Sequence, residues 1–168
     1  MFGLPGKSSA DKKRVERLYA ATVARARAPV FFTKLGVPDT IDGRFDLLAL
    51  HAWLILDRLR DEKLGALSQG LTDTIFLGFD EGLRDLGTGD MGMGRRIKKL
   101  ADAFYGRLQA YDTSKDSATM AETVQRNLYR GTGDESHAQT VAHYIETARE
   151  YVAGSDVASG EVNFGPLP

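Results

Sequence analysis

The sequence predicts an all-α fold: a single compact helical domain of about six helices with an irregular C-terminal tail. Apolar residues recur every three or four positions along most of the chain, whereas no segment alternates cleanly as a half-buried strand would. The length of 168 residues suits one domain with a sizeable core. We expect a flexible N-terminus at residues 1–10, a helical domain at 11–153 and a C-terminal extension at 154–168.

The first long helix is expected to be apolar along one stripe, whereas the second long helix is expected to be apolar on nearly every side. Ser8 or Ser9 can cap the first helix, which ends before Pro29. Its apolar stripe consists of Val15, Leu18, Thr22 and Val23. A turn-rich connection with a short helix at Val30–Leu35 follows, and then a helix from about Arg44 to Arg60 that is apolar on nearly every side. Such a helix belongs at the centre of the domain.

The next helices are amphipathic. Residues 65–86 carry an apolar ladder of Leu67, Leu71, Ile75, Phe79 and Leu83. Gly87 is suited to the position just after the end of this helix. The following helix presents Ile97, Leu100, Ala101, Phe104, Leu108 and Tyr111 on one face.

Two polar breaks separate the last helices. DTSKDS at Asp112–Ser117 and GTGDE at 131–135 interrupt the apolar pattern. The helices beyond them carry Met120, Val124 and Leu128, and then Ala138, Val141, Ile145, Ala148 and Val152. We expect the small, polar, proline-ended tail from Gly154 to Pro168 to pack loosely.

Composition limits the function. The chain is 42% hydrophobic and 27% charged, as in ordinary soluble domains, and its net charge of −1 excludes attraction to polyanions through bulk charge. Without cysteine, it has no disulfide, thiolate zinc site or cysteine nucleophile. No apolar run approaches the roughly 20 residues that span a bilayer. The start, MFGLPGKSSADKK, lacks the apolar core of a secretory signal.

The stretch GTGDMGMGRR at Gly87–Arg96 matches the Gly-x-Gly-x-x-Gly pattern of dinucleotide-binding loops. That pattern functions between a strand and a helix, but here the preceding segment is helical. A helix–loop–helix corner, with Asp90 capping the next helix, explains the glycines. It does not explain Met91 and Met93, which suit a surface that accommodates varied apolar partners. The two interpretations are compatible.

Other candidate sites have simpler explanations. His51 lies on an apolar helix face, where a hydrogen-bonded core histidine is the usual case and a haem or metal ligand the alternative. His137 and His143 are six apart and share no helix face, and we expect His137 to be solvated. No Ser/His/Asp set suggests catalysis.

A cluster of aspartates, Asp39, Asp42 and Asp46, precedes the central helix. Hard-cation binding and acid–base chemistry are conceivable for such a cluster. The simpler interpretation is a helix start with carboxylates near the positive end of its dipole, and Arg44 paired with one of them.

Two segments resemble the ubiquinol–cytochrome c chaperone family. They are GVPDTIDGRFDLLALHAWLILDRL at Gly36–Leu59 and GLRDLGTGDMGMGRRIKKLADAFYGRL at Gly82–Leu108, and the resemblance extends from about Val30 to Tyr111. It implies an all-helical chaperone, without catalytic activity, that binds newly made cytochrome b and supports assembly of the bc1 complex. Because the sequence shows no long basic transit-like N-terminus, we expect a bacterial cytoplasmic protein, peripheral at the inner membrane, rather than an organellar precursor. No cofactor or metal is expected.

The resemblance and the methionine–arginine stretch together predict a client-binding surface. Its residues are Asp39, Asp42, Arg44, Asp90, Met91, Met93, Arg95, Arg96, Lys98 and Lys99. The methionines would contact apolar client segments, and the cations would engage acidic client residues or anionic headgroups. An anionic membrane and a small adaptor protein are further candidate partners, and no nucleic acid is expected beyond proximity to a ribosome. The alternative is a small-ligand protein that binds an anionic ligand or haem at the Gly87–Gly94 loop.

Overall fold

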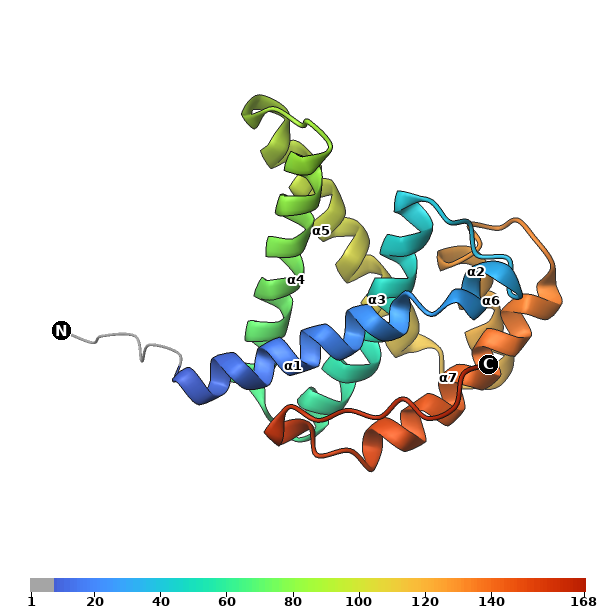
Figure 1. The fold of residues 1–168 in the computed structure, drawn as a ribbon. Coiled ribbons are helices and arrows are strands. Elements are labelled where there is room, and N and C mark those ends of the chain that lie inside the picture. The colour runs from blue at the N-terminus through green and yellow to red at the C-terminus, as the bar shows by residue number, and fades with distance from the viewer. Residues whose placement is uncertain (1–7) are drawn as a thin grey trace.

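Residues 8–168, the part of the chain that this computed structural model describes, form seven α-helices and one short 3-10 helix (Figure 1). The elements are α1 (Ser9–Ala26), α2 (Pro29–Thr33), α3 (Ile41–Asp61), α4 (Gly65–Asp85), α5 (Asp90–Thr113), α6 (Ser117–Asn127), α7 (Glu135–Ala153) and η1 (Val157–Ser159). Six of the α-helices have 11 residues or more, and residues 8–168 contain no strand. The all-α prediction is therefore confirmed.

Helix α3 is the centre of the domain, as its apolar circumference predicts. It packs against α1, α4, α5, α7 and η1, and Leu47, Leu50 and Ile55 on it are fully buried. In Figure 1, α1 crosses α3, and α6 with α7 lies on the opposite side from α4. The α4–α5 hairpin projects away from this body, so its far end is remote from the core.

Helix starts follow the capping residues of the sequence. Ser8 accepts a hydrogen bond from the Asp11 backbone at 3.1 Å, and Asp116 and Asp134 cap α6 and α7 in the same way. Thr40 accepts from the Gly43 backbone at 3.1 Å, so α3 begins at Ile41, three residues before the expected position. Asp42 and Arg44 consequently lie in its first turn rather than in a loop.

The expected flexible N-terminus falls mainly outside the described residues. Its positions 1–7 are not described, and Ser9 and Ala10 already belong to α1.

The prediction that residues 154–168 pack loosely is wrong. Val157 and Phe164 are buried, and the Phe164 ring lies edge-on to His51 of α3 with centroids 5.5 Å apart. Arg25 of α1 donates from Nη2 to the Pro166 carbonyl at 2.9 Å and also to the Gly165 carbonyl. The tail looks polar in sequence because few of its side chains, chiefly Val157 and Phe164, enter the core.

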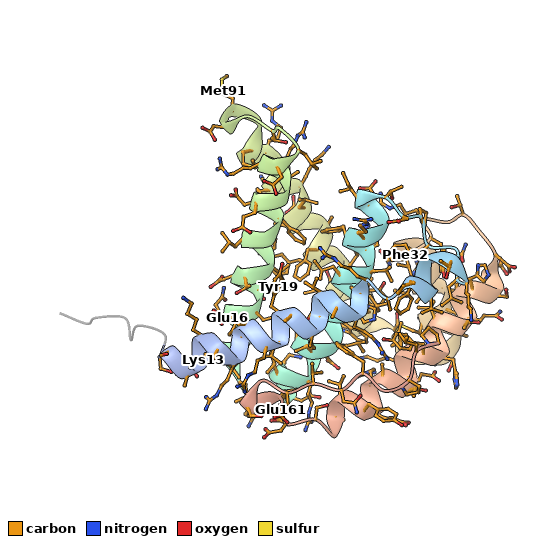
Figure 2. All side chains as sticks on the ribbon, viewed as in Figure 1. Lys13, Glu16, Tyr19, Phe32, Met91 and Glu161 are labelled. Carbon is orange, nitrogen blue, oxygen red and sulfur yellow. The ribbon has the colours of Figure 1, made fainter. Side chains whose placement is uncertain are left out.

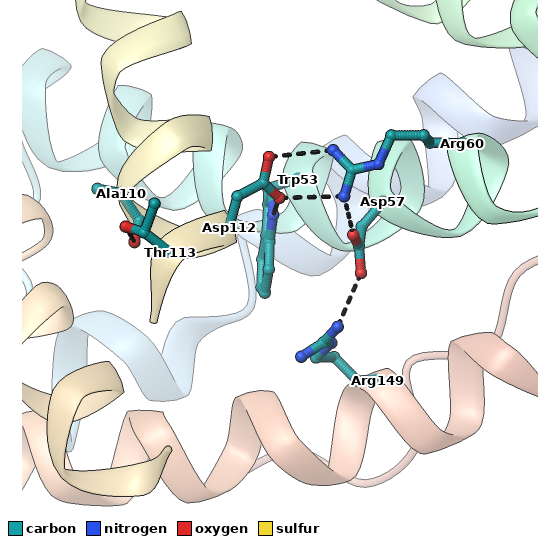
Figure 3. A network of polar contacts seen from close by, with 7 residues as sticks. All are labelled: Trp53, Asp57, Arg60, Ala110, Asp112, Thr113 and Arg149. Carbon is teal, nitrogen blue, oxygen red and sulfur yellow. Dashed lines mark hydrogen bonds and ion pairs between the residues drawn. The ribbon is translucent and has the colours of Figure 1, made fainter. Parts of the chain in front are cut away.

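A polar network joins α3, α5 and α7 (Figure 3). The Trp53 indole donates to Asp112 at 2.7 Å, and Arg60 donates to the other oxygen of Asp112 at 3.0 Å. Asp57 accepts from Arg60 and, at 3.0 Å, from Arg149. Burial alone would raise the pKa of Asp112, but the donors Arg60 and Trp53 outweigh it and hold that pKa below its usual value.

Candidate functional site

The far end of the α4–α5 hairpin is the most prominent surface of the molecule (Figure 2). Helix α4 ends in a turn closed by two backbone hydrogen bonds, from Gly87 to the Arg84 carbonyl at 2.9 Å and from Thr88 to the Leu83 carbonyl at 3.1 Å. Gly87 has a φ of +82°, which this motif requires. The predicted role of Gly87 is therefore confirmed, and four residues, 86–89, reverse the chain.

The predicted loop Gly87–Gly94 is shorter than expected. Helix α5 begins at Asp90 and includes Gly92 and Gly94, because Met93 extends its apolar face by one turn before Ile97. The predicted cap is also wrong: Gly89 is the N-cap residue, and Asp90 lies in the first turn, where it pairs with Arg84 at 2.9 Å. Its carboxylate already occupies the positive end of the helix, which disfavours an anionic ligand there.

The two methionines have opposite environments. Met91 is fully exposed at the end of the hairpin, whereas only 5% of Met93 is accessible. Placing Met93 on the binding surface was therefore wrong. Met93 fixes the first turn of α5 and leaves Met91 in solvent beside the exposed Leu86.

Four cations follow this exposed methionine along the first turns of α5. Arg95, Arg96, Lys98 and Lys99 are all exposed. Arg96 donates to the Thr88 hydroxyl at 3.1 Å, while Arg95, Lys98 and Lys99 have no side-chain partner within residues 8–168. We call Leu86, Met91 and these four cations the tip surface. It combines solvent-exposed apolar atoms with unpaired positive charge.

Asp39, Asp42 and Arg44 lie at a second place, the start of α3. Arg44 pairs with Asp39 at 2.8 Å and Arg130 approaches Asp42 to 3.4 Å. All three predicted residues are exposed, so a role in binding is sterically open to them. The pairing of Arg44 with one aspartate, which the sequence analysis predicts, is confirmed.

The third member of that aspartate cluster serves a different purpose. Asp46 is 1% exposed, and it accepts from Arg107 of α5 at 2.8 Å and from Arg130 at 3.0 Å. These two ion pairs of the buried Asp46 join α3 to α5 and to the segment after α6, so Asp46 is structural.

His51 is a buried core residue, as predicted. Its Nδ1 donates to the Leu47 carbonyl at 2.8 Å, so the neutral ring accepts at Nε2 from the Tyr144 hydroxyl at 2.9 Å. The same hydroxyl accepts from Arg25 Nε at 2.9 Å. Neither ring nitrogen is free to bind haem iron or a metal.

The burial of His51 predicts a loss of stability in mild acid. Burial, and secondarily the nearby positive charge of Arg25, lowers the pKa of His51 to about 4 from 6.5, so the unfolded chain binds an extra proton between these values. Stability must therefore fall as the pH drops below 6.5, by about 2 kcal/mol at pH 5. Urea unfolding between pH 7 and pH 5 measures this, and a His51→Gln variant should lack this component of the pH dependence. If wild type and His51→Gln lost the same free energy of unfolding between pH 7 and pH 5, the assigned role of His51 would be contradicted.

The other histidines form no metal site. His137 is half-buried and lies against the Tyr129 ring, so the expectation that it is solvated is wrong. His143 is exposed, 3.8 Å from Glu146. Within residues 8–168, no group of three or more potential ligand residues is arranged to hold a metal ion. No helix in the same range is long and apolar enough to cross a bilayer.

Two exposed apolar residues near the predicted site could not be identified from the sequence. Ile41 at the start of α3 is 64% exposed, and Leu86 at the end of α4 is 62% exposed. Both fit the apolar period of their helices, so nothing in the sequence separates them from core residues.

Comparison with protein families agrees with the resemblance. A family model described as ubiquinol–cytochrome c chaperone matches residues 33–160. The match includes the last helices, beyond the region that carries the resemblance in the sequence.

Individual relatives agree as well. The ubiquinol–cytochrome c reductase complex assembly factor 1 of Xenopus laevis is 23% identical over an aligned length of 160 residues, and the alignment covers 90% of this chain and 80% of that protein. The human protein of the same name is 22% identical, and the chain spans only 54% of its length. The crystal structure of the Cbp3 homolog from Brucella abortus superposes with a TM-score of 0.83 at 36% identity, covering 94% of this chain and 91% of that one.

Proposed function

Because this chain belongs to the ubiquinol–cytochrome c chaperone family, we propose that it binds newly made cytochrome b and supports assembly of the ubiquinol–cytochrome c reductase (bc1) complex. It acts by binding alone, and no residue is assigned a catalytic role. The name of its frog relative, an assembly factor for that complex, supports the proposal.

The observation that carries the proposal is the tip surface. Met91 is fully exposed on a hairpin that projects from the body, with Leu86 close by and three cations unpaired within residues 8–168. An exposed methionine adapts its shape to different apolar segments at little cost. The cations attract acidic client residues and hold the client near anionic headgroups. A newly made membrane subunit presents both kinds of surface.

The other predicted binding residues also have roles in this proposal. Asp39, Asp42 and Arg44 contribute a second, mixed-charge contact at the start of α3, and Asp90 orients Arg84 beneath the tip. In this proposal the protein works in the cytoplasm, peripherally at the inner membrane. A small adaptor protein is an additional partner in this proposal, and the protein works close to the ribosome.

Capture of the client tests the proposal. The tagged full chain is crosslinked in native membranes and purified, and attached proteins are identified. We expect cytochrome b to be enriched relative to a strain that expresses the tag alone. Recovery of other membrane proteins to the same extent as cytochrome b would contradict it.

A further inference from the structure

An apolar groove lies between α1, α3 and α4, with α5 at one end. Its walls include Tyr19 and Val23 of α1, Ile41 and Leu48 of α3, Phe79 of α4, and Leu86 directly after α4. In Figure 2, Tyr19 lies between α1 and α4, at the foot of the hairpin. The groove has a volume of about 290 Å³, at or below the roughly 300–1,000 Å³ of small-ligand pockets. It therefore holds a few side chains rather than a large cofactor.

Two of the groove residues expose far more apolar surface than folding requires. Ile41 is 64% and Leu86 62% accessible, one on each side of the groove. Exposed large apolar side chains that line the same groove are typical of a binding site. Leu86 also belongs to the tip surface, so a client bound there can continue into the groove.

The α4 wall has room for a closely packed partner. Gly82 lines the groove, and a Cβ atom built on it has no neighbour within 4 Å. Gly78, one turn earlier, faces Tyr19 instead. Bare backbone at such a position lets a second helix approach closely.

The charges at the groove are of one sign. Arg27 and Arg44 line it, and no carboxylate does among residues 8–168. Arg44 pairs with Asp39, but Arg27 is exposed and has no hydrogen bond or ion pair from its side chain within the described part of the chain. An arginine beside an apolar groove is a typical energetic anchor for a partner carboxylate.

We propose that this groove binds one apolar helix of the client, with a client carboxylate paired to Arg27. The inference rests on the proposed chaperone function and specifies where and how the client is bound. An apolar helix matches a groove with three helical walls, as in other helix-in-groove complexes. A flat lipid surface would not fill such a concave site.

Two leucine substitutions test the inference. Gly82→Leu fills the groove, whereas Gly106→Leu adds the same side chain on the exposed face of α5, where a Cβ also meets nothing within 4 Å. Both replace a helical glycine with a better helix former, so both should unfold at or above the wild-type temperature. We expect Gly82→Leu to recover at least tenfold less crosslinked cytochrome b than wild type, and Gly106→Leu to recover the wild-type amount.

Arginine variants test the charge. Arg27→Glu should lose at least tenfold in capture, and Arg27→Lys should keep most of it. Equal capture by wild type and Gly82→Leu would overturn the groove proposal while leaving the proposed function intact. Failure of wild type to capture cytochrome b would instead overturn the proposed function.

Other occupants give different results. A wild-type dimer that Gly82→Leu converts to a monomer would assign the groove to a second copy of this chain. Loss of binding to vesicles containing anionic lipid, with capture of cytochrome b retained, would assign it to the membrane. Either outcome would overturn the proposal.

Discussion

Replacing Gly43 with alanine is expected to lower the free energy of unfolding by about 3 kcal/mol or more, the upper range for overpacked sites. Gly43 is buried in the first turn of α3, and a Cβ atom there would lie 1.9 Å from the Pro38 carbonyl oxygen. That carbonyl accepts from the Thr40 backbone at 2.9 Å, while Thr40 caps α3 through Gly43. The clash cannot relax without disturbing the start of the central helix.

Chemical denaturation of Gly43→Ala and Gly106→Ala measures this effect. Alanine normally stabilises a helix relative to glycine by about 1 kcal/mol, and Gly106 has open space around it. The two variants should therefore shift in opposite directions. Stabilisation of both would show that the approach of Pro38 to α3 is not as described.

Reversing charge at the tip surface is expected to reduce capture of cytochrome b at least tenfold. Arg95→Glu with Arg96→Glu replaces two exposed cations next to Met91, so a client carboxylate would meet repulsion instead of attraction. A tenfold loss corresponds to about 1.4 kcal/mol, within the usual range for charged contacts at an interface. Capture by wild type should also weaken as salt is added, because salt screens exposed charges.

The matched control is Lys12→Glu with Lys13→Glu. Both lysines are exposed on α1, Figure 2 shows Lys13 far from Met91, and the double substitution changes net charge by the same amount. Surface changes of this kind rarely alter stability by more than about 0.5 kcal/mol, so folding should be preserved in both variants. Equal capture by the two double variants would remove the basic residues from the binding surface.

The central helix and its histidine could be predicted from sequence because their signals are local. The apolar circumference of residues 44–60 placed the helix in the core, and the leucines around His51 indicated its burial. The caps of α1 and the end of α4 at Gly87 likewise depend only on neighbouring residues. These features are the same in the structure as in the sequence prediction because tertiary contacts do not oppose the local preferences.

The error about the C-terminal tail concerns contacts between segments that are distant in sequence. Phe164 is buried against α3, and Arg25 of α1 holds the tail in place through a hydrogen bond to the Pro166 carbonyl. Nothing in the sequence around either residue indicates that the two segments meet. Met93 lies four residues before Ile97 and so continues the apolar face of α5, whereas Met91 does not, but the expected loop at Gly87–Gly94 concealed this local signal. The groove could not be predicted either, because it exists only where α1, α3 and α4 meet.

Deleting the gene for this protein and measuring cytochrome b in the membrane tests the central claim most directly. We predict that haem-containing cytochrome b and assembled bc1 complex fall severely, and that the wild-type gene restores both. Normal amounts of cytochrome b and bc1 complex in the deletion strain would contradict the account.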